Sequence, residues 1–268
     1  RLHAQYVDIL KSLCADIAST YESCVPSPPD SIIHFGSRKA PKPQIITEIF
    51  AVLKFTIFSQ AEDDLISIFN HYNIWLWHIL LLFTAARPVA EFPGFLKNFN
   101  LKRQILMVSD KEAGGRNGFG RLIPLCSFLV EEIKKFLKFL EYFSTQIMMS
   151  HPALSDAIQQ IEASKLPFLG IIQNDEWKPL SHSTVKNFHP ELGLAHENWH
   201  RHTARAFLTH KFSEPEILAL FGHELMQQEA AHPFSSLSLS QFSKIANVLE
   251  QMKDQFKISG IEVHVIIQ

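Results

Sequence analysis

The sequence predicts a mainly α-helical protein with a small antiparallel sheet, an α+β fold. Two observations lead to this prediction. Apolar residues recur at helical spacing through most of the 268-residue chain, which is 46% hydrophobic and contains 22 Phe. In contrast, two short β-prone runs, Ile105–Val108 and Leu122–Leu125, flank a loop rich in Gly and Asn and predict a β-hairpin. A chain of this length and composition can bury a large core, as one large domain or two small ones.

The N-terminal part consists of a helical pattern and a proline-rich stretch. Residues 2–24 carry apolar side chains at helical spacing. Residues 25–44 contain five prolines and the basic residues Arg38, Lys39 and Lys42. This composition is typical of a linker.

Apolar helical sequence resumes at Ile45 and continues to Ala86, with breaks expected near 60–63 and near 71–73. Its most apolar part, 74–86, is too short to cross about 30 Å of hydrocarbon and contains His78. We therefore expect a buried core helix and no membrane contact. Pro88 suits the first turn of another helix, which Pro93-Gly94 would end.

Beyond the predicted hairpin, the sequence indicates mostly helices. Long helices are expected at about 127–148 and 151–162, followed by a short strand within 166–172. Helical sequence then continues to about residue 256, and a strand-like run at 261–268 ends the chain.

Charge and cysteine content limit the classes of function. The net charge is −2 and the pI about 6.7, so any binding of nucleic acid requires a local basic patch. The three cysteines are odd in number and lack metal-ligand spacing, which is typical of reduced thiols in an intracellular, cytoplasmic protein. We see no signal peptide in the sequence.

Four separated motifs carry the functional information. They are "FTAARPVAEF" (83–92), "MVSDKEAGGRNGFGRLIPL" (107–125), "NWHRHTARAFLTH" (198–210) and "LALFGHE" (218–224). In this order the chain resembles the tyrosine recombinases, the phage integrase family, over roughly residues 45–257. The family shows T-G-x-R-x-x-E at a helix end, a hairpin lysine, H-x-x-R-H-T, an L-G-H turn and a nucleophilic tyrosine about nine residues later.

The resemblance implies a domain organisation and a set of catalytic residues. Residues 1–24 would be the remnant of an N-terminal or core-binding domain, 25–44 a basic linker and 45–268 the catalytic domain. Arg87 and Arg201 would neutralise the phosphate bidentately, and Lys111 would protonate the leaving oxygen. His223 would hold a phosphate oxygen. Glu91 lies one residue too far from Arg87 to be carried over.

Two departures from the family pattern affect strand cleavage. Asn198 stands where the family has its first histidine, and an amide donates a hydrogen bond but does not shuttle a proton. His232 stands where the tyrosine is expected, and no tyrosine follows Tyr142. Three readings stay open: His232 is the nucleophile, Ser235 or Ser236 attacks, or cleavage has been lost and DNA binding retained.

The resemblance also implies partners. Double-stranded DNA is the expected ligand, with self-association on DNA through the helical segment 238–256 and with no cofactor. Predicted backbone contacts come from the linker residues and from a patch around the hairpin, comprising Arg38, Lys39, Lys42, Lys97, Lys102, Arg103, Arg116 and Arg121.

A zinc metallohydrolase is the alternative reading. His196-Glu197-Asn198-Trp199-His200 matches H-E-x-x-H, which would place two histidines on one helix face with Glu197 as the base. No third-ligand pattern follows, and Arg201 and Arg205 beside the site would repel a cation. We therefore expect no metal there.

Overall fold

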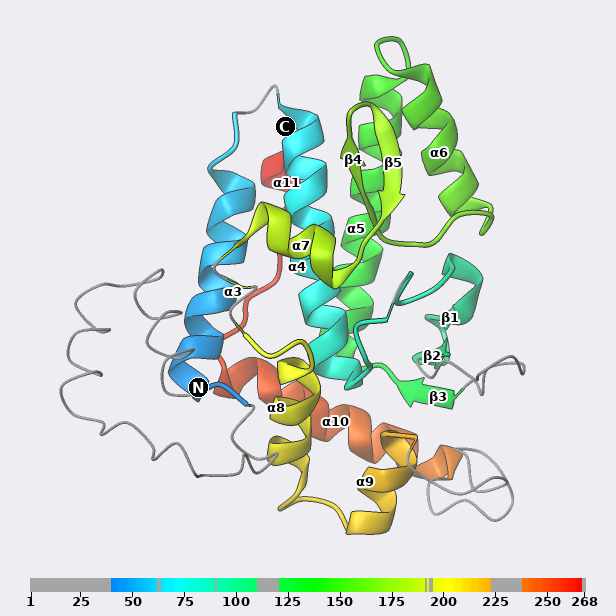
Figure 1. The fold of residues 1–268 in the computed structure, drawn as a ribbon. Coiled ribbons are helices and arrows are strands. Elements are labelled where there is room, and N and C mark those ends of the chain that lie inside the picture. Colours follow the sequence, from blue (N-terminus) through cyan, green and yellow to red (C-terminus); the bar gives the residue numbers. More distant parts are fainter. Residues whose placement is uncertain are drawn as a thin grey trace, which may run out of the picture.

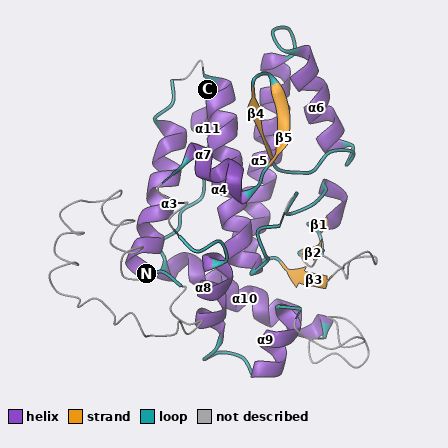
Figure 2. Cartoon of the chain, in the orientation of Figure 1, coloured by secondary structure: helices purple, strands orange, loops and turns teal. Residues whose placement is uncertain are grey.

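The computed structural model describes residues 40–61, 64–89, 91–109, 121–190, 192, 195–222 and 238–266. This part of the chain is mainly helical with two small antiparallel sheets, as the sequence predicts (Figures 1 and 2). The helices are α3 (Pro43–Phe58), α4 (Leu65–Thr84), η2 (Leu96–Asn98), α5 (Ser127–Ile147), α6 (Pro152–Glu162), α7 (His182–Phe188), α8 (Trp199–Leu208), α9 (Glu214–Leu220), α10 (Leu239–Gln255) and α11 (Val263–Ile266). The strands are β1 (Phe99–Asn100), β2 (Ile105–Val108), β3 (Arg121–Pro124), β4 (Gly170–Gln173) and β5 (Glu176–Pro179).

Helix α4 is the centre of the core. It contacts α3, α5, α8 and β4, so almost every residue after Ser67 is buried (Figure 1). A helix that is apolar all round is stable only when it is covered on every side. Leu65–Thr84 is also long and apolar enough to cross a membrane, but 78% of its most apolar window is buried inside the protein. That burial is what a core helix shows.

Helix α5 packs beside α4 through aromatic side chains. Its apolar face places Phe136, Phe139 and Phe143 in the core. Phe143 stacks on Phe69 of α4 at 4.7 Å between ring centroids, and Phe136 meets Tyr72 edge-on at 5.0 Å. The predicted helices at 127–148 and 151–162 are therefore confirmed as α5 and α6.

The predicted hairpin is confirmed. Strands β2 and β3 pair antiparallel, with Leu106 opposite Ile123, and both of these side chains are fully buried. Strand β1 adds a short third strand beside β2, which the sequence reading missed because it is only two residues long. The loop between β2 and β3, which carries Lys111 and Arg116, lies outside the described residues.

A second hairpin, β4–β5, follows α6. The strand expected within 166–172 is confirmed as β4, whereas β5 was missed. Asn174 and Asp175 join the strands with φ of 55° and 58°, the backbone conformation of a two-residue type I′ turn. Glycine is favoured at position 170, which pairs with Pro179, because a Cβ there would lie 2.3 Å from the indole of Trp177.

The predicted break near 71–73 is wrong, because α4 runs through it without interruption. The polar residues that gave the impression of a break bind β4. Asn70 both donates to and accepts from the backbone of Ile172, at 2.9 and 2.7 Å, and the Asn73 side chain accepts from Gly170 N at 3.3 Å. The buried side-chain amides of Asn70 and Asn73 thus provide hydrogen-bond partners for backbone groups of β4.

Three other local predictions are corrected by the structure. Helix α3 begins at Pro43, so the last two residues of the predicted linker are helical. The helix expected from Pro88 does not form, because Val89 N bonds to Arg87 O in a tight turn. The strand-like run at the C-terminus contains helix α11 over Val263–Ile266. The predicted helix at 2–24 and most of the linker lie outside the described residues.

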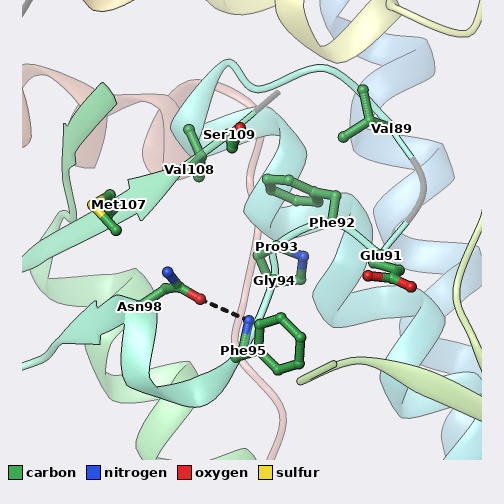
Figure 3. A pocket seen from close by; sticks show the side chains of 10 residues that line it. All are labelled: Val89, Glu91, Phe92, Pro93, Gly94, Phe95, Asn98, Met107, Val108 and Ser109. Atoms are coloured by element: carbon green, nitrogen blue, oxygen red, sulfur yellow. Dashed lines mark hydrogen bonds between the residues drawn. The ribbon is translucent and has the colours of Figure 1, made fainter. Parts of the chain in front are cut away.

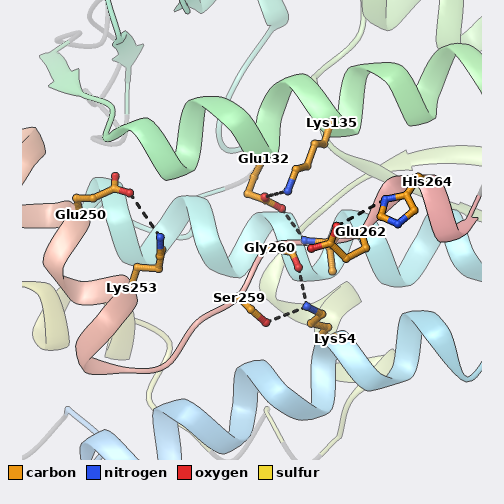
Figure 4. A network of polar contacts seen from close by, with 10 residues as sticks. Lys54, Glu132, Lys135, Glu250, Lys253, Ser259, Gly260, Glu262 and His264 are labelled. Atoms are coloured by element: carbon orange, nitrogen blue, oxygen red, sulfur yellow. Dashed lines mark hydrogen bonds and ion pairs between the residues drawn. The ribbon is translucent and has the colours of Figure 1, made fainter.

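The segment after α10 is fixed to the core by polar contacts (Figure 4). The buried carboxylate of Glu132 on α5 accepts from Ile261 N at 2.9 Å and from Lys135 Nζ at 2.7 Å. Lys54 of α3 donates to Ser259 Oγ at 2.8 Å and to Gly260 O at 2.6 Å. The segment therefore lies against α3 and α5 of its own chain.

Candidate functional site

Arg201 joins two of the predicted motifs. Its guanidinium donates to Ala85 O at 2.6 Å and to Phe221 O at 2.5 Å, and it lies over the Phe221 ring at 4.6 Å. Ala85 is two residues before Arg87, and Phe221 is two residues before His223. Arg201 is only 6% exposed, so it holds the ends of α4 and α9 together from inside the protein.

We call the place where Arg201 holds the ends of α4 and α9 the Arg201 junction. Arg121 of the β2–β3 hairpin contacts the same place. This residue begins β3 and donates to Leu220 O, next to the carbonyl that Arg201 uses. Arg121 is buried, and its predicted contact with DNA stays a prediction. Two guanidinium groups hold adjacent carbonyls at the end of α9. Hydrogen bonds to neutral carbonyls leave the positive charge of both groups in place.

The backbone after α4 turns at Ala85, which has a φ of 51°. This left-handed conformation is the one that glycine adopts most easily, and glycine occupies this position in the family pattern T-G-x-R. The turn points Ala85 O toward Arg201 and carries the chain to Arg87, whose side chain is half-buried. The position of Arg87 next to the junction therefore follows from the helix end.

The junction thus gathers the described parts of all four motifs. Arg87, Arg121, Arg201 and Phe221 come from segments far apart in the sequence. The predicted catalytic residues Lys111, His223 and His232 lie outside the described residues, although described residues flank Lys111 and His223 on this side. Their roles stay predictions.

Asn198 lies at the start of α8, one turn before Arg201. Its backbone N–H donates to His196 Nδ1 at 3.1 Å and its backbone carbonyl accepts from His202 N. The side chain does not cap the helix, and its Oδ1 is buried without a hydrogen-bond partner among the described residues. The structure therefore places Asn198 one helical turn before Arg201, and its side-chain oxygen has no hydrogen-bond partner among the described residues.

An open pocket of about 240 Å³ lies between the segment that follows Arg87 and strand β2 (Figure 3). It extends from Val89, just after Arg87, to Ser109, the last described residue before the Lys111 loop. Phe92 and Met107 form apolar walls, and Asn98 Oδ1 accepts from Phe95 N at 2.9 Å. Glu91, which the family pattern did not place, is exposed on the rim with a φ of 61°.

The H-E-x-x-H motif does not lie on one helix. Helix α8 begins at Trp199, so His196 precedes it while His200 lies inside. His200 Nε2 is 2.6 Å from His78 Nδ1 of α4, and both rings are buried. The expected arrangement of two histidines on one helix face is therefore wrong. Among the described residues, no group of three or more His, Cys, Asp or Glu could hold a metal.

Tyr72, one of the two tyrosines in the described part of the chain, is structural. It is completely buried between α4 and α5, and burial raises the pKa of its phenol far above the ordinary value. A neutral phenol enclosed by Trp75 and Phe136 does not serve as a nucleophile. The other, Tyr142, lies half-buried on α5.

The predicted DNA contacts divide into exposed and undescribed residues. Lys97, Lys102 and Arg103 are exposed around β1 and the turn that follows it, with Arg103 N bonded to Asn100 Oδ1 at 3.0 Å. Lys42 is exposed at the start of α3. Arg38, Lys39 and Arg116 lie outside the described residues.

Sequence reasoning missed two contributors to the junction. His78 was noted only as a polar interruption of an apolar run, and that interruption was the available signal. The structural use of Arg121 had no signal, because its partner is a backbone carbonyl and any residue supplies one.

Comparison of the chain with protein-family models, with curated proteins and with solved structures yields no match.

Proposed function

We propose that this protein binds duplex DNA through its phosphates at the Arg201 junction, as a recombinase-like protein that does not cleave DNA through a tyrosine. The single observation that carries the proposal is the pair of hydrogen bonds from Arg201 to Ala85 and Phe221. They bring together motifs that the resemblance to the tyrosine recombinases had connected only by their order.

Electrostatics supports a phosphate ligand at this place. Arg87, Arg121 and Arg201 carry guanidinium groups, which stay charged at any physiological pH. Burial beneath the surface strengthens the field of Arg121 and Arg201, because less water screens it. The exposed residues Lys102 and Arg103 lie in the turn between β1 and β2 and add positive charge to the surface there.

Strand cleavage is the part of the family activity that the chain supports least. The position of the nucleophile is His232, and the general acid/base position is Asn198. Loss of both would impair the same reaction, whereas Arg87 and Arg201 would still bind a phosphate. Exchange of the helical segment 238–256 between protomers is also less favoured, because α10 packs on α5 and β3 of its own chain.

The zinc hydrolase alternative has no specific support, since His200 is engaged by His78 and His196 lies outside α8.

The test is binding of a labelled duplex at several salt concentrations. We expect the logarithm of the affinity to fall linearly with the logarithm of salt, by about 0.9 per phosphate neutralised. The double variant Lys102→Ala/Arg103→Ala should bind more weakly with a shallower slope. Lys134→Ala/Lys138→Ala removes the same charge from exposed positions on α5 and serves as the control. A wild-type affinity that does not change with salt would refute the proposal.

A further inference from the structure

Helix α8 is attached to α4 at two points. Arg201 bonds to Ala85 O at the end of α4, and the preceding residue, His200, bonds to His78 about two helical turns earlier. Trp199, Ala204 and Leu208 of α8 are also buried, so packing contributes to the position of this helix. The two hydrogen bonds from adjacent residues add two fixed points for the rotation and the height of α8 against α4.

The two imidazoles are enclosed by indoles. Trp199 stacks on His200 at 3.7 Å between ring centroids, and Trp77 meets His78 edge-on at 5.0 Å. His78 is 3% and His200 2% exposed. Burial lowers the pKa of both rings, so at neutral pH the pair is uncharged and one ring donates to the other.

The His78–His200 pair lowers the stability of the folded state compared with apolar side chains at the same positions. His78 Nε2 and His200 Nδ1 are buried, and neither has a hydrogen-bond partner within the described parts of the chain. Each such orphan atom destabilises the folded state, and two apolar side chains of similar size would avoid both penalties. Buried polar pairs of this kind can fix one arrangement at the expense of stability.

We propose that His78 and His200 are positioning residues that hold the Arg201 guanidinium in place for a DNA phosphate. The inference rests on the proposed function, since it assigns the pair a purpose at that same site. It explains why a polar side chain interrupts the most apolar helix of the protein. It also explains why the interruption occurs opposite the residue before Arg201.

The test compares variants that keep the hydrogen bond with variants that remove it. The amide of Asn places a polar atom near the position of Nδ1, and that of Gln near Nε2. His78→Asn and His200→Gln should therefore keep duplex affinity within about twofold. His78→Leu should lower the affinity about tenfold, the effect also expected of Arg201→Ala, and reduce the salt slope by about 0.9.

Thermal unfolding separates positioning from simple stabilisation. The double variant His78→Leu/His200→Leu removes both partners of the hydrogen bond and both orphan nitrogens, so its Tm should equal or exceed that of the wild type while its affinity falls. A purely structural pair would make affinity follow Tm across all of these variants. Full affinity in a folded His78→Leu protein would overturn the inference.

A measurement without DNA keeps this inference distinct from the proposed function. Hydrogen exchange of the α8 amides should be faster in His78→Leu than in the wild type and unchanged in His78→Asn. If the wild type does not bind DNA but α8 shows this pattern, the proposed function is wrong and the positioning of α8 stands. Unchanged exchange in His78→Leu would overturn the positioning as well.

Discussion

Arg201 and Ala85 are 116 residues apart in the sequence and share a hydrogen bond of 2.6 Å. The bond joins Ala85, the first residue after α4, to helix α8, which contains most of the motif at 198–210. It also explains why the arginine is buried although its expected ligand is a surface phosphate. The guanidinium organises the backbone on which Arg87 and the segment before His223 are carried.

The first prediction concerns the two hydrogen bonds that the planar guanidinium of Arg201 donates at the same time. Arg201→Lys keeps the charge, but an ammonium group cannot reach both Ala85 O and Phe221 O as a planar fork does. One buried carbonyl would lose its donor, so we expect the free energy of unfolding to fall by about 1–3 kcal/mol. Urea denaturation measures this loss. Wild-type stability in the lysine variant would show that the fork is not required.

The C-terminal end of α10 offers a gain in stability. Lys257 has a φ of 51°, and Ile258 N bonds back to Lys253 O at 2.8 Å, the pattern of a helix end that favours glycine. Lys257→Gly should raise the free energy of unfolding by about 0.5–1 kcal/mol. Lys257→Ala, which removes the charge and keeps Cβ, should be neutral. Equal effects of both changes would point to charge as the cause.

Stability should depend on pH through the buried histidines. In the folded state burial lowers the pKa of His78 to about 3 and holds that of His200 well below 6.5. The unfolded chain therefore takes up protons first as the pH falls below 6.5. The stability is complete above pH 6.5 and decreases toward the folded pKa, by about 1.4 kcal/mol per pH unit for each histidine.

His78→Asn removes one of these titrating groups while keeping a polar partner for His200. Its free energy of unfolding should therefore fall less steeply between pH 7 and 5, by about 1 kcal/mol per pH unit on average, because the unfolded-state pKa of about 6.5 lies inside this interval. Denaturant titrations at half-unit steps measure the two slopes. Parallel slopes would show that His78 is not buried in the neutral form. The carboxylates with lowered pKa, Glu131 and Glu216, titrate below this window.

Glu132 should control attachment of the C-terminal segment. Glu132→Ala leaves Ile261 N–H without its acceptor, and the loss should be about 2–3 kcal/mol. Glu132→Gln keeps an acceptor oxygen and loses only the pairing with Lys135, so it should cost about 1 kcal/mol. Limited proteolysis near residue 260 reports release of the segment. Equal protection of Ala and Gln variants would contradict this role.

Pattern and composition were sufficient for the framework of the fold. The periodicity of 127–148, the length of 74–86 and the hairpin runs are local signals, and the structure contains α5, α4 and β2–β3 there. Local signals failed where a polar side chain had a distant partner. Residues 71–73 were predicted to break the helix because the partner of Asn73, strand β4, lies about a hundred residues away along the chain.

The sequence motifs indicated candidate residues for the site but not their contacts. Arg87 and Arg201 were found by motif, and the structure brings their segments together. The burial of Arg201 and Arg121 depends on backbone carbonyls, which leave no mark in a sequence. H-E-x-x-H was misread because the start of α8 is set by packing of Trp199 and His200 on α4, and no capping side chain marks it.

The last prediction concerns covalent chemistry. A tyrosine recombinase is trapped on a nicked DNA substrate as a denaturant-resistant adduct. Where the resemblance to that family places the nucleophile and the acid/base, this chain has His232 and Asn198. We expect duplex binding without an adduct. His232→Tyr alone should restore little, because Asn198 still lacks a transferable proton, whereas His232→Tyr combined with Asn198→His should trap more DNA than either change alone. The measurement is the labelled fraction that survives denaturing electrophoresis. An adduct in the wild type that disappears in His232→Ala would identify histidine as the nucleophile, and an adduct that persists in His232→Ala but is lost in Ser235→Ala/Ser236→Ala would identify serine.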